Sequence, residues 1–211
     1  MYEQLYNLLE TNEFEIEEAD PSVLWGGLLS LNEKMHREQP AKLLAECLDL
    51  VGGALDSQDP LPIDHFAYYI GEYRNDKAVF DWIEFMYREM EEERIRSLDY
   101  GPSYIVPLHY GTQGWWLSIG LNDGTAVELF ACKQFGPWLR YPKAKRLSLM
   151  SHPAYRVGSK EDVFRFVDRY RGTEGYEILK LTEEDSVGHT YGHIRNNRTN
   201  RVVEIVYSSS N

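Results

Sequence analysis

The chain has 211 residues, of which 43% are hydrophobic and 27% charged, and its formal net charge is −12. This composition is typical of a globular protein with one large domain or two small ones. The negative charge argues against nucleic-acid binding, which needs a basic surface, and no apolar run approaches the ~20 residues of a membrane-spanning helix.

The N-terminus lacks the basic flank and the apolar core of a signal peptide. The two cysteines, Cys47 and Cys132, lie in unrelated sequence contexts, which argues against a disulfide framework. We therefore expect a cytoplasmic protein.

Residues 1–60 carry most of the charge, with 13 acidic and 3 basic residues, whereas the remaining 151 residues have a net charge of only −2. Apolar residues at helical spacing predict three helices, over 2–11, from Asp20-Pro21 and from Pro40. The acidic side is expected to be a solvated surface, and the alternative is a docking surface for a basic protein partner or for self-association. Residues 56–60, which are polar and end in proline, predict a domain boundary.

Residues 61–132 are predicted to form a first module in the order strand, helix and three strands. A helix from Asn75 to about Arg96 has apolar residues every three or four positions. Asn122-Asp123-Gly124 predicts a hairpin, since Asp-Gly is typical of a type I′ turn. The expected strands are 63–70, 103–109, 115–121 and 125–132.

Residues 133–148 contain two prolines with basic and aromatic residues, and they are expected to form an irregular connector. The second module, residues 149–211, repeats the order of the first. Ser159 is expected to cap its helix, with Asp162 completing a weak capping box. The expected strands are 151–157, 176–181, 189–195 and 201–208.

Each module has one histidine in its first strand and one glutamate in its last, within an apolar context. A buried glutamate is costly unless it is paired or bound to a metal. If the two sheets face each other about a pseudo-two-fold axis, these four side chains converge on one point. Two imidazoles and two carboxylates suit divalent zinc, nickel, cobalt, manganese or iron. The expected ligands are His65, Glu128, His152 and Glu204.

The repeated β-α-β-β-β order resembles the vicinal oxygen chelate superfamily, which includes glyoxalase I, methylmalonyl-CoA epimerase, extradiol dioxygenases and bleomycin-resistance proteins. The resemblance covers residues 61–208 and is carried by the segments IDHFAYYI, VELF, SHPAYRV and VEIV. It implies an α+β fold of two tandem glyoxalase-like modules, preceded here by the helical N-terminal extension. It also implies a divalent metal ion that binds neighbouring oxygens of a small-molecule substrate.

By the same resemblance, Glu128 and Glu204 are the candidate catalytic residues, because a glutamate released from the metal can act as a base. The activity would be that of a lyase, an isomerase or epimerase, or a dioxygenase. Trp115, His109 and His193 are the candidate substrate contacts. In a two-residue turn, Glu128 would lie opposite Ile119 and share a face of the sheet with Trp115.

Two alternatives remain open. A metal-free protein that holds a small ligand, as antibiotic-sequestering relatives do, would suit a cationic ligand because the chain is acidic and rich in aromatic residues. An interaction protein would act through residues 1–60.

Overall fold

The computed structural model describes residues 1–11, 15–37, 40–49, 61–183 and 188–209. These residues form two compact units. Unit 1 consists of Met1–Met35 and Phe66–Ser151, and unit 2 consists of His36–His65 and His152–Asn211. The predicted boundary at residues 56–60 lies outside the described residues.

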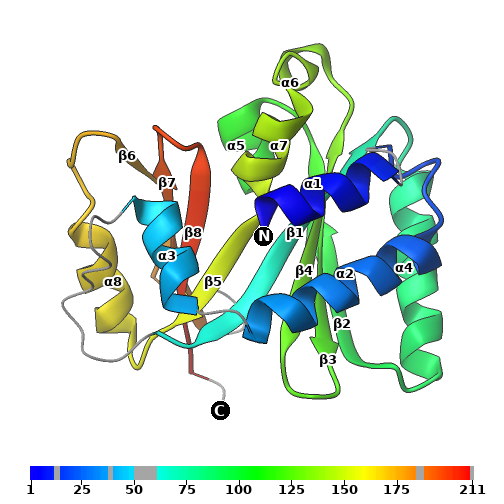
Figure 1. The fold of residues 1–211 in the computed structure, drawn as a ribbon, viewed down its shortest axis with the longest axis horizontal. Helices are drawn as coiled ribbons and strands as arrows, with labels where there is room; N and C mark the ends of the chain where they lie inside the picture. The colour runs from blue at the N-terminus through cyan, green and yellow to red at the C-terminus, as the bar shows by residue number, and fades with distance from the viewer. Residues whose placement is uncertain (12–14, 38–39, 50–60, 184–187, 210–211) are drawn as a thin grey trace. The chain divides into compact units, whose positions relative to one another are not determined.

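Both units contain a β-sheet, and Figure 1 labels the elements. Unit 1 has the strand order β2-β3-β4-β1, and in unit 2 the first residues of β1 are followed by β5-β8-β7-β6. The resulting order β-α-β-β-β occurs twice, so the predicted α+β fold with two tandem modules is confirmed. The strands are β1 (Ile63–Tyr73), β2 (Ile95–Pro102), β3 (Gly114–Leu121), β4 (Ala126–Lys133), β5 (His152–Arg156), β6 (Tyr176–Thr182), β7 (His189–Asn196) and β8 (Arg201–Ser208).

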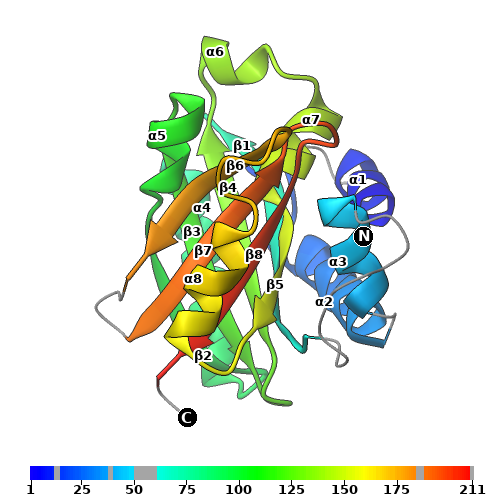
Figure 2. The ribbon, with the colours of Figure 1, turned by 90° about the vertical axis from the view of Figure 1, so that its left-hand side faces the viewer.

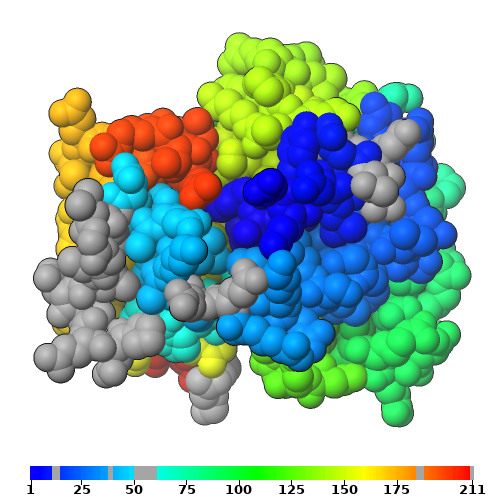
Figure 3. Space-filling view, in the orientation of Figure 1, coloured from blue at the N-terminus to red at the C-terminus, as the bar shows by residue number. Residues whose placement is uncertain are grey.

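The three predicted N-terminal helices are also present. The helix α2 begins as the sequence indicates, because Asp20 Oδ1 accepts a hydrogen bond of 2.9 Å from the Ser22 amide. Figure 3 shows α1 and α2 lying against each other in unit 1. Their apolar sides are buried in the core, including Leu5, Leu24 and Leu28, which are each 0% exposed. The helices are α1 (Tyr2–Thr11), α2 (Pro21–Arg37) and α3 (Pro40–Leu48).

The two module helices are α4 (Lys77–Glu91) in unit 1 and α8 (Lys160–Asp168) in unit 2. The predicted cap of α8 is confirmed, since the Ser159 side chain accepts a hydrogen bond from the Asp162 amide. Helix α4 ends earlier than expected, where Glu93 adopts a left-handed φ of 57°. No helix among the described residues is both long and apolar enough to cross a membrane.

Two predicted segments are wrong. The expected strand over 103–109 is instead the helix α5 (Ile105–Tyr110), and the second strand of the module is β2. The Ser103 hydroxyl accepts a hydrogen bond from the Val106 amide, and Gly111, at φ 69°, ends the helix. The connector expected to be irregular contains α6 (Gly136–Leu139) and α7 (Lys143–Met150), because its prolines occupy the starts of these helices.

The sheet of unit 2 has one face covered by helices. Val167 of α8 packs so closely on Gly192 of β7 that an added Cβ would lie 2.5 Å from it. Tyr155 of β5 and Asn196 of β7 donate hydrogen bonds to main-chain carbonyls of α3, at Pro40 and Cys47 respectively. Figure 2 shows α8 lying across β7 and β8. Because side chains alternate along a strand, residues one position away from these face the opposite side of the sheet.

Candidate metal centre

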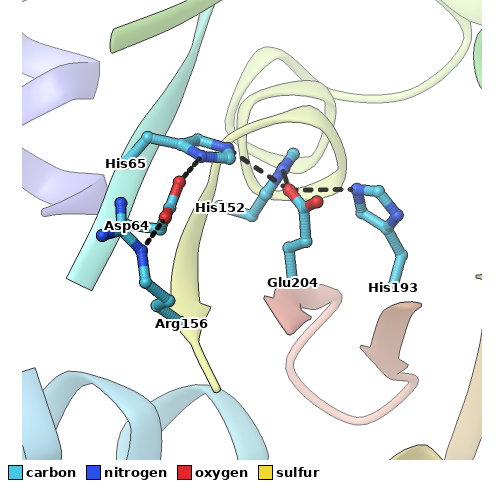
Figure 4. A network of polar contacts seen from close by, with 6 residues as sticks. All are labelled: Asp64, His65, His152, Arg156, His193 and Glu204. Atoms are coloured by element: carbon cyan, nitrogen blue, oxygen red, sulfur yellow. Dashed lines mark hydrogen bonds and ion pairs between the residues drawn. The ribbon is translucent and has the colours of Figure 1, made fainter. Parts of the chain in front are cut away.

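The register of unit 2 brings polar side chains from neighbouring strands to the face of the sheet that α3 and α8 do not cover. Glu204 of β8 is paired with Ala154 of β5 and with His193 of β7. His152 lies two residues before Ala154, so it points to the same side. His65 comes from the first residues of β1. Figure 4 shows these side chains pointing toward one another.

Three imidazoles surround one oxygen of Glu204. The distances from Glu204 Oε2 to the Nε2 atoms are 3.3 Å for His65, 3.4 Å for His152 and 3.6 Å for His193. All four residues are buried, with exposed fractions between 4% and 7%. The strands thus concentrate one carboxylate and three imidazoles in a site shielded from water.

His65, His152 and Glu204 fit a metal ion. One donor atom from each lies within 4.8 Å of the other two. Two donors bound about 2.0–2.2 Å from the same ion lie about 3–3.5 Å apart, which is close to the 3.3 Å and 3.4 Å between Glu204 and these histidines. Two imidazoles with one carboxylate also form a donor set that zinc, nickel, cobalt, manganese and iron accept.

The electrostatics of Glu204 favour a negatively charged carboxylate. Burial alone would raise its pKa, but the positive charge of His193 and the contacts with the imidazoles of His152 and His65 outweigh burial. The pKa of Glu204 therefore lies well below its usual value. A carboxylate that keeps its charge in a buried site is the form that a cation binds.

A second carboxylate contacts the cluster from behind His65. Asp64 Oδ1 lies 3.1 Å from His65 Nδ1, and its other oxygen accepts a hydrogen bond of 2.6 Å from Arg156 Nε. Burial would raise the pKa of Asp64, but His65 and Arg156 lower it on balance. Neither Asp64 nor Arg156 was among the predicted site residues, although Asp64 directly precedes His65 in the segment IDHFAYYI.

His193 belongs to the same cluster. The sequence did not decide on which face of the sheet its side chain lies. Its orientation depends on the hairpin loop, where Asn196 pairs with Arg201 and residues 197–200 form the turn. Tyr191, two residues earlier, has its ring centre 5.6 Å from that of His193. Burial and the charge of Glu204 raise the pKa of Tyr191 to about 12, so its hydroxyl keeps its proton at neutral pH.

Glu128 lies in unit 1, and its role stays a prediction. Its expected partner is wrong: it pairs with Ser118, whereas Ile119 pairs with Val127. The hairpin has a three-residue loop in which Gly124 adopts a φ of 88°, rather than a two-residue turn.

Trp115 therefore lies on the opposite face from Glu128, contrary to expectation. It packs on the helix-covered face, with its ring centre 5.5 Å from that of Phe80 in α4. His109 is half-buried in α5, also in unit 1. The substrate contacts predicted for Trp115 and His109 stay predictions.

Comparison with known proteins gives structural likenesses only. No model of a protein family matches this chain, and no curated protein matches it significantly. A variant of methylmalonyl-CoA epimerase from Streptomyces coelicolor, solved in complex with 2-nitronate-propionyl-CoA, is 19% identical, with a TM-score of 0.36. This match covers 70% of this chain and 97% of that chain.

Two further structures extend this picture. Methylmalonyl-CoA epimerase from Mycobacterium tuberculosis is 10% identical, covers 72% of this chain and 92% of its own, and has a TM-score of 0.39. A glyoxalase I mutant from Zea mays is 17% identical, with 71% of this chain and 44% of that chain covered and a TM-score of 0.36.

The structures similar to this chain thus include two of the groups that the sequence resembles. At identities below 25% and TM-scores below 0.5, these likenesses assign neither an activity nor a metal. The two β-α-β-β-β modules follow from the order of elements in the chain itself, and its candidate centre is the buried cluster of His65, His152 and Glu204.

Proposed function

We propose that this chain is a metal-dependent enzyme of the vicinal-oxygen-chelate type, in which His65, His152 and Glu204 hold a divalent ion. The observation that carries this proposal is the convergence of three buried donors, from three different strands, within 4.8 Å of one another. The substrate would be a small molecule that offers two neighbouring oxygens.

The metal would supply Lewis acidity, polarising a substrate oxygen and stabilising negative charge on it. The protein residues have separate tasks. The strands β5 and β8 hold His152 and Glu204 in register, and their burial keeps water from the donors. His193 and the protonated Tyr191 flank Glu204 on the same face, where they would orient a substrate by hydrogen bonds.

The reaction class is proposed as lyase, isomerase or epimerase, or dioxygenase. The set of two histidines and one carboxylate leaves positions open for substrate, and it is also the set used by non-haem iron oxygenases. Glu204 is the proposed carboxylate ligand, and Glu128 is proposed as a further ligand or as the base.

Metal analysis tests the proposal. We expect about one ion per chain in protein purified without chelator, and its loss in His65→Ala, His152→Ala and Glu204→Ala. His189→Ala is the matched control, because His189 lies in β7 of the same unit but outside the three-donor group. A wild-type protein that binds none of zinc, nickel, cobalt, manganese or iron would contradict the proposal.

A second candidate function is metal-free binding of a small ligand. The cluster favours it in one respect, since a charged imidazole can balance the Glu204 carboxylate without any ion. Ligand binding by protein freed of metal with a chelator would identify this function.

A protein partner that docks on the acidic N-terminal segment is a third possibility. Helices α1–α3 already bury apolar side chains in the two units, so such a contact would use their exposed sides.

A further inference from the structure

One contact of the cluster is made on the far side of the imidazole of His65. The Nε2 atom of this ring lies 3.3 Å from Glu204, while Nδ1 lies 3.1 Å from Asp64. A neutral imidazole carries one proton, so the nitrogen that holds it cannot also bind a metal ion. The position of this proton on the ring therefore decides whether Nε2 of His65 can bind an ion.

Asp64 and Glu204 lie at opposite nitrogens of the ring, and either carboxylate can accept a hydrogen bond from it. If Nε2 carries the proton, His65 donates to Glu204 and closes the cluster against a cation. If Nδ1 carries it, His65 donates to Asp64 and presents the Nε2 lone pair to the site. An acceptor beside Nδ1 favours the second arrangement, because it fixes the tautomer of the ring.

Arg156 holds Asp64 in the orientation that this arrangement needs. Its Nε donates a hydrogen bond of 2.6 Å to Asp64 Oδ2, which leaves Oδ1 for His65. The Arg156 amide also donates a hydrogen bond of 2.9 Å to the carbonyl of Pro62. Both ends of Arg156 therefore link the end of β5 to the residues at the start of β1.

Burial makes this pair of contacts effective. The side chain of Asp64 is 17% exposed and that of His65 is 8% exposed, so water competes little for the contact between them. Arg156 is 45% exposed, which lets its positive charge stay hydrated while its Nε contacts Asp64.

We propose that Asp64 and Arg156 are positioning residues that fix the proton of His65 on Nδ1 and so keep Nε2 available to a divalent ion. This inference rests on the proposed metal site. It predicts that metal affinity depends on a carboxylate that does not itself bind the ion.

The test compares Asp64→Asn with Asp168→Asn. Both remove one carboxylate charge from an Asp–Arg pair in unit 2, but Asp168, at the end of α8, pairs with the exposed Arg171 and not with a histidine of the cluster. His65 and Arg156 contact different oxygens of Asp64, and Asp64→Asn replaces one of these oxygens by an NH2 group, which cannot accept a hydrogen bond. We expect a loss of zinc affinity of about 10–100-fold in Asp64→Asn, a smaller loss in Arg156→Gln, and no change in Asp168→Asn or Arg171→Gln.

Zinc affinity is measured by competition with a chromophoric chelator, and circular dichroism checks that each variant is folded. Equal zinc affinity in folded Asp64→Asn and wild type would overturn the inference. A second measurement, ¹⁵N NMR of the histidine side chains in metal-free protein, reports which nitrogen of His65 carries the proton.

The NMR measurement separates the two proposals. If the wild type binds no metal, the proposed function fails, and the NMR result still decides the role of Asp64. A proton on Nδ1 of wild-type His65 that moves to Nε2 in Asp64→Asn supports the inference. The same proton position in both proteins overturns it.

Discussion

His193 of β7 stands directly opposite Glu204 of β8, and its Nε2 atom lies 3.6 Å from Glu204 Oε2. The pairing places a third imidazole beside the carboxylate that His65 and His152 approach. His193 is nevertheless not part of the group whose donors all lie within 4.8 Å of one another. His65 and His152 therefore suit the role of metal ligands, whereas His193 suits a contact with the ligand Glu204.

The first prediction concerns Glu204. We expect Glu204→Gln to weaken zinc binding by more than about 100-fold, because even outer contacts of a metal site typically contribute 10–100-fold. The amide keeps the shape of the side chain but removes the only carboxylate of the three-donor group. Isothermal titration with zinc measures the change. Glu177→Gln, in β6 of the same unit, is the control and should bind zinc as the wild type does.

The second prediction separates the histidines. His193→Gln should change zinc affinity by less than about tenfold, whereas His65→Gln should change it by more than about 100-fold, because His193 lies outside the three-donor group. The same titrations measure both variants. Equal losses in the two variants would show that His193 is itself a ligand.

The third prediction concerns pH. Because the pKa of Glu204 is well below its usual value, the carboxylate stays ionised as the pH falls from 7.5 to about 5.5. Its contribution to stability, present at neutral pH, is lost only when the pH falls through that lowered pKa. A histidine binds a metal ion only through a nitrogen without a proton, so protons compete with the ion for the imidazoles.

Zinc affinity should therefore fall on acidification, by roughly tenfold per pH unit for each ligand histidine that is protonated. Competition titrations at several pH values measure this slope. An affinity that stays constant between pH 7.5 and 5.5 would contradict ligation by histidine.

The fourth prediction concerns the N-terminal helices. Leu28 of α2 is 0% exposed, whereas Val23 of the same helix is 57% exposed. Leu28→Ala should lower the free energy of unfolding by about 2–5 kcal/mol, because it leaves a cavity in the core. Val23→Ala should change it by less than about 0.5 kcal/mol. Urea denaturation measures both, and equal effects would show that α2 does not pack as described.

The sequence alone determined the kinds of elements and most of their positions. Hydrophobic periodicity located both module helices and seven of the eight strands, and Asp20 and Ser159 located two helix starts, because these features depend on residues close together in the chain. It failed where local chemistry allows two outcomes. Residues 103–109 can extend or turn, and the turn after Leu121 has three residues, although Asp-Gly also fits a turn of two.

The tertiary structure decided which polar side chains meet. His65, His152 and Glu204 were predicted to converge, but their distances depend on the register between β5 and β8, which joins residues about 50 positions apart. The place of His193 depends on the loop after Asn196, and that of Asp64 depends on Arg156, 92 positions away in the chain. Alternation along a strand assigns each side chain to a face, but only the pairing of strands brings particular atoms within bonding distance.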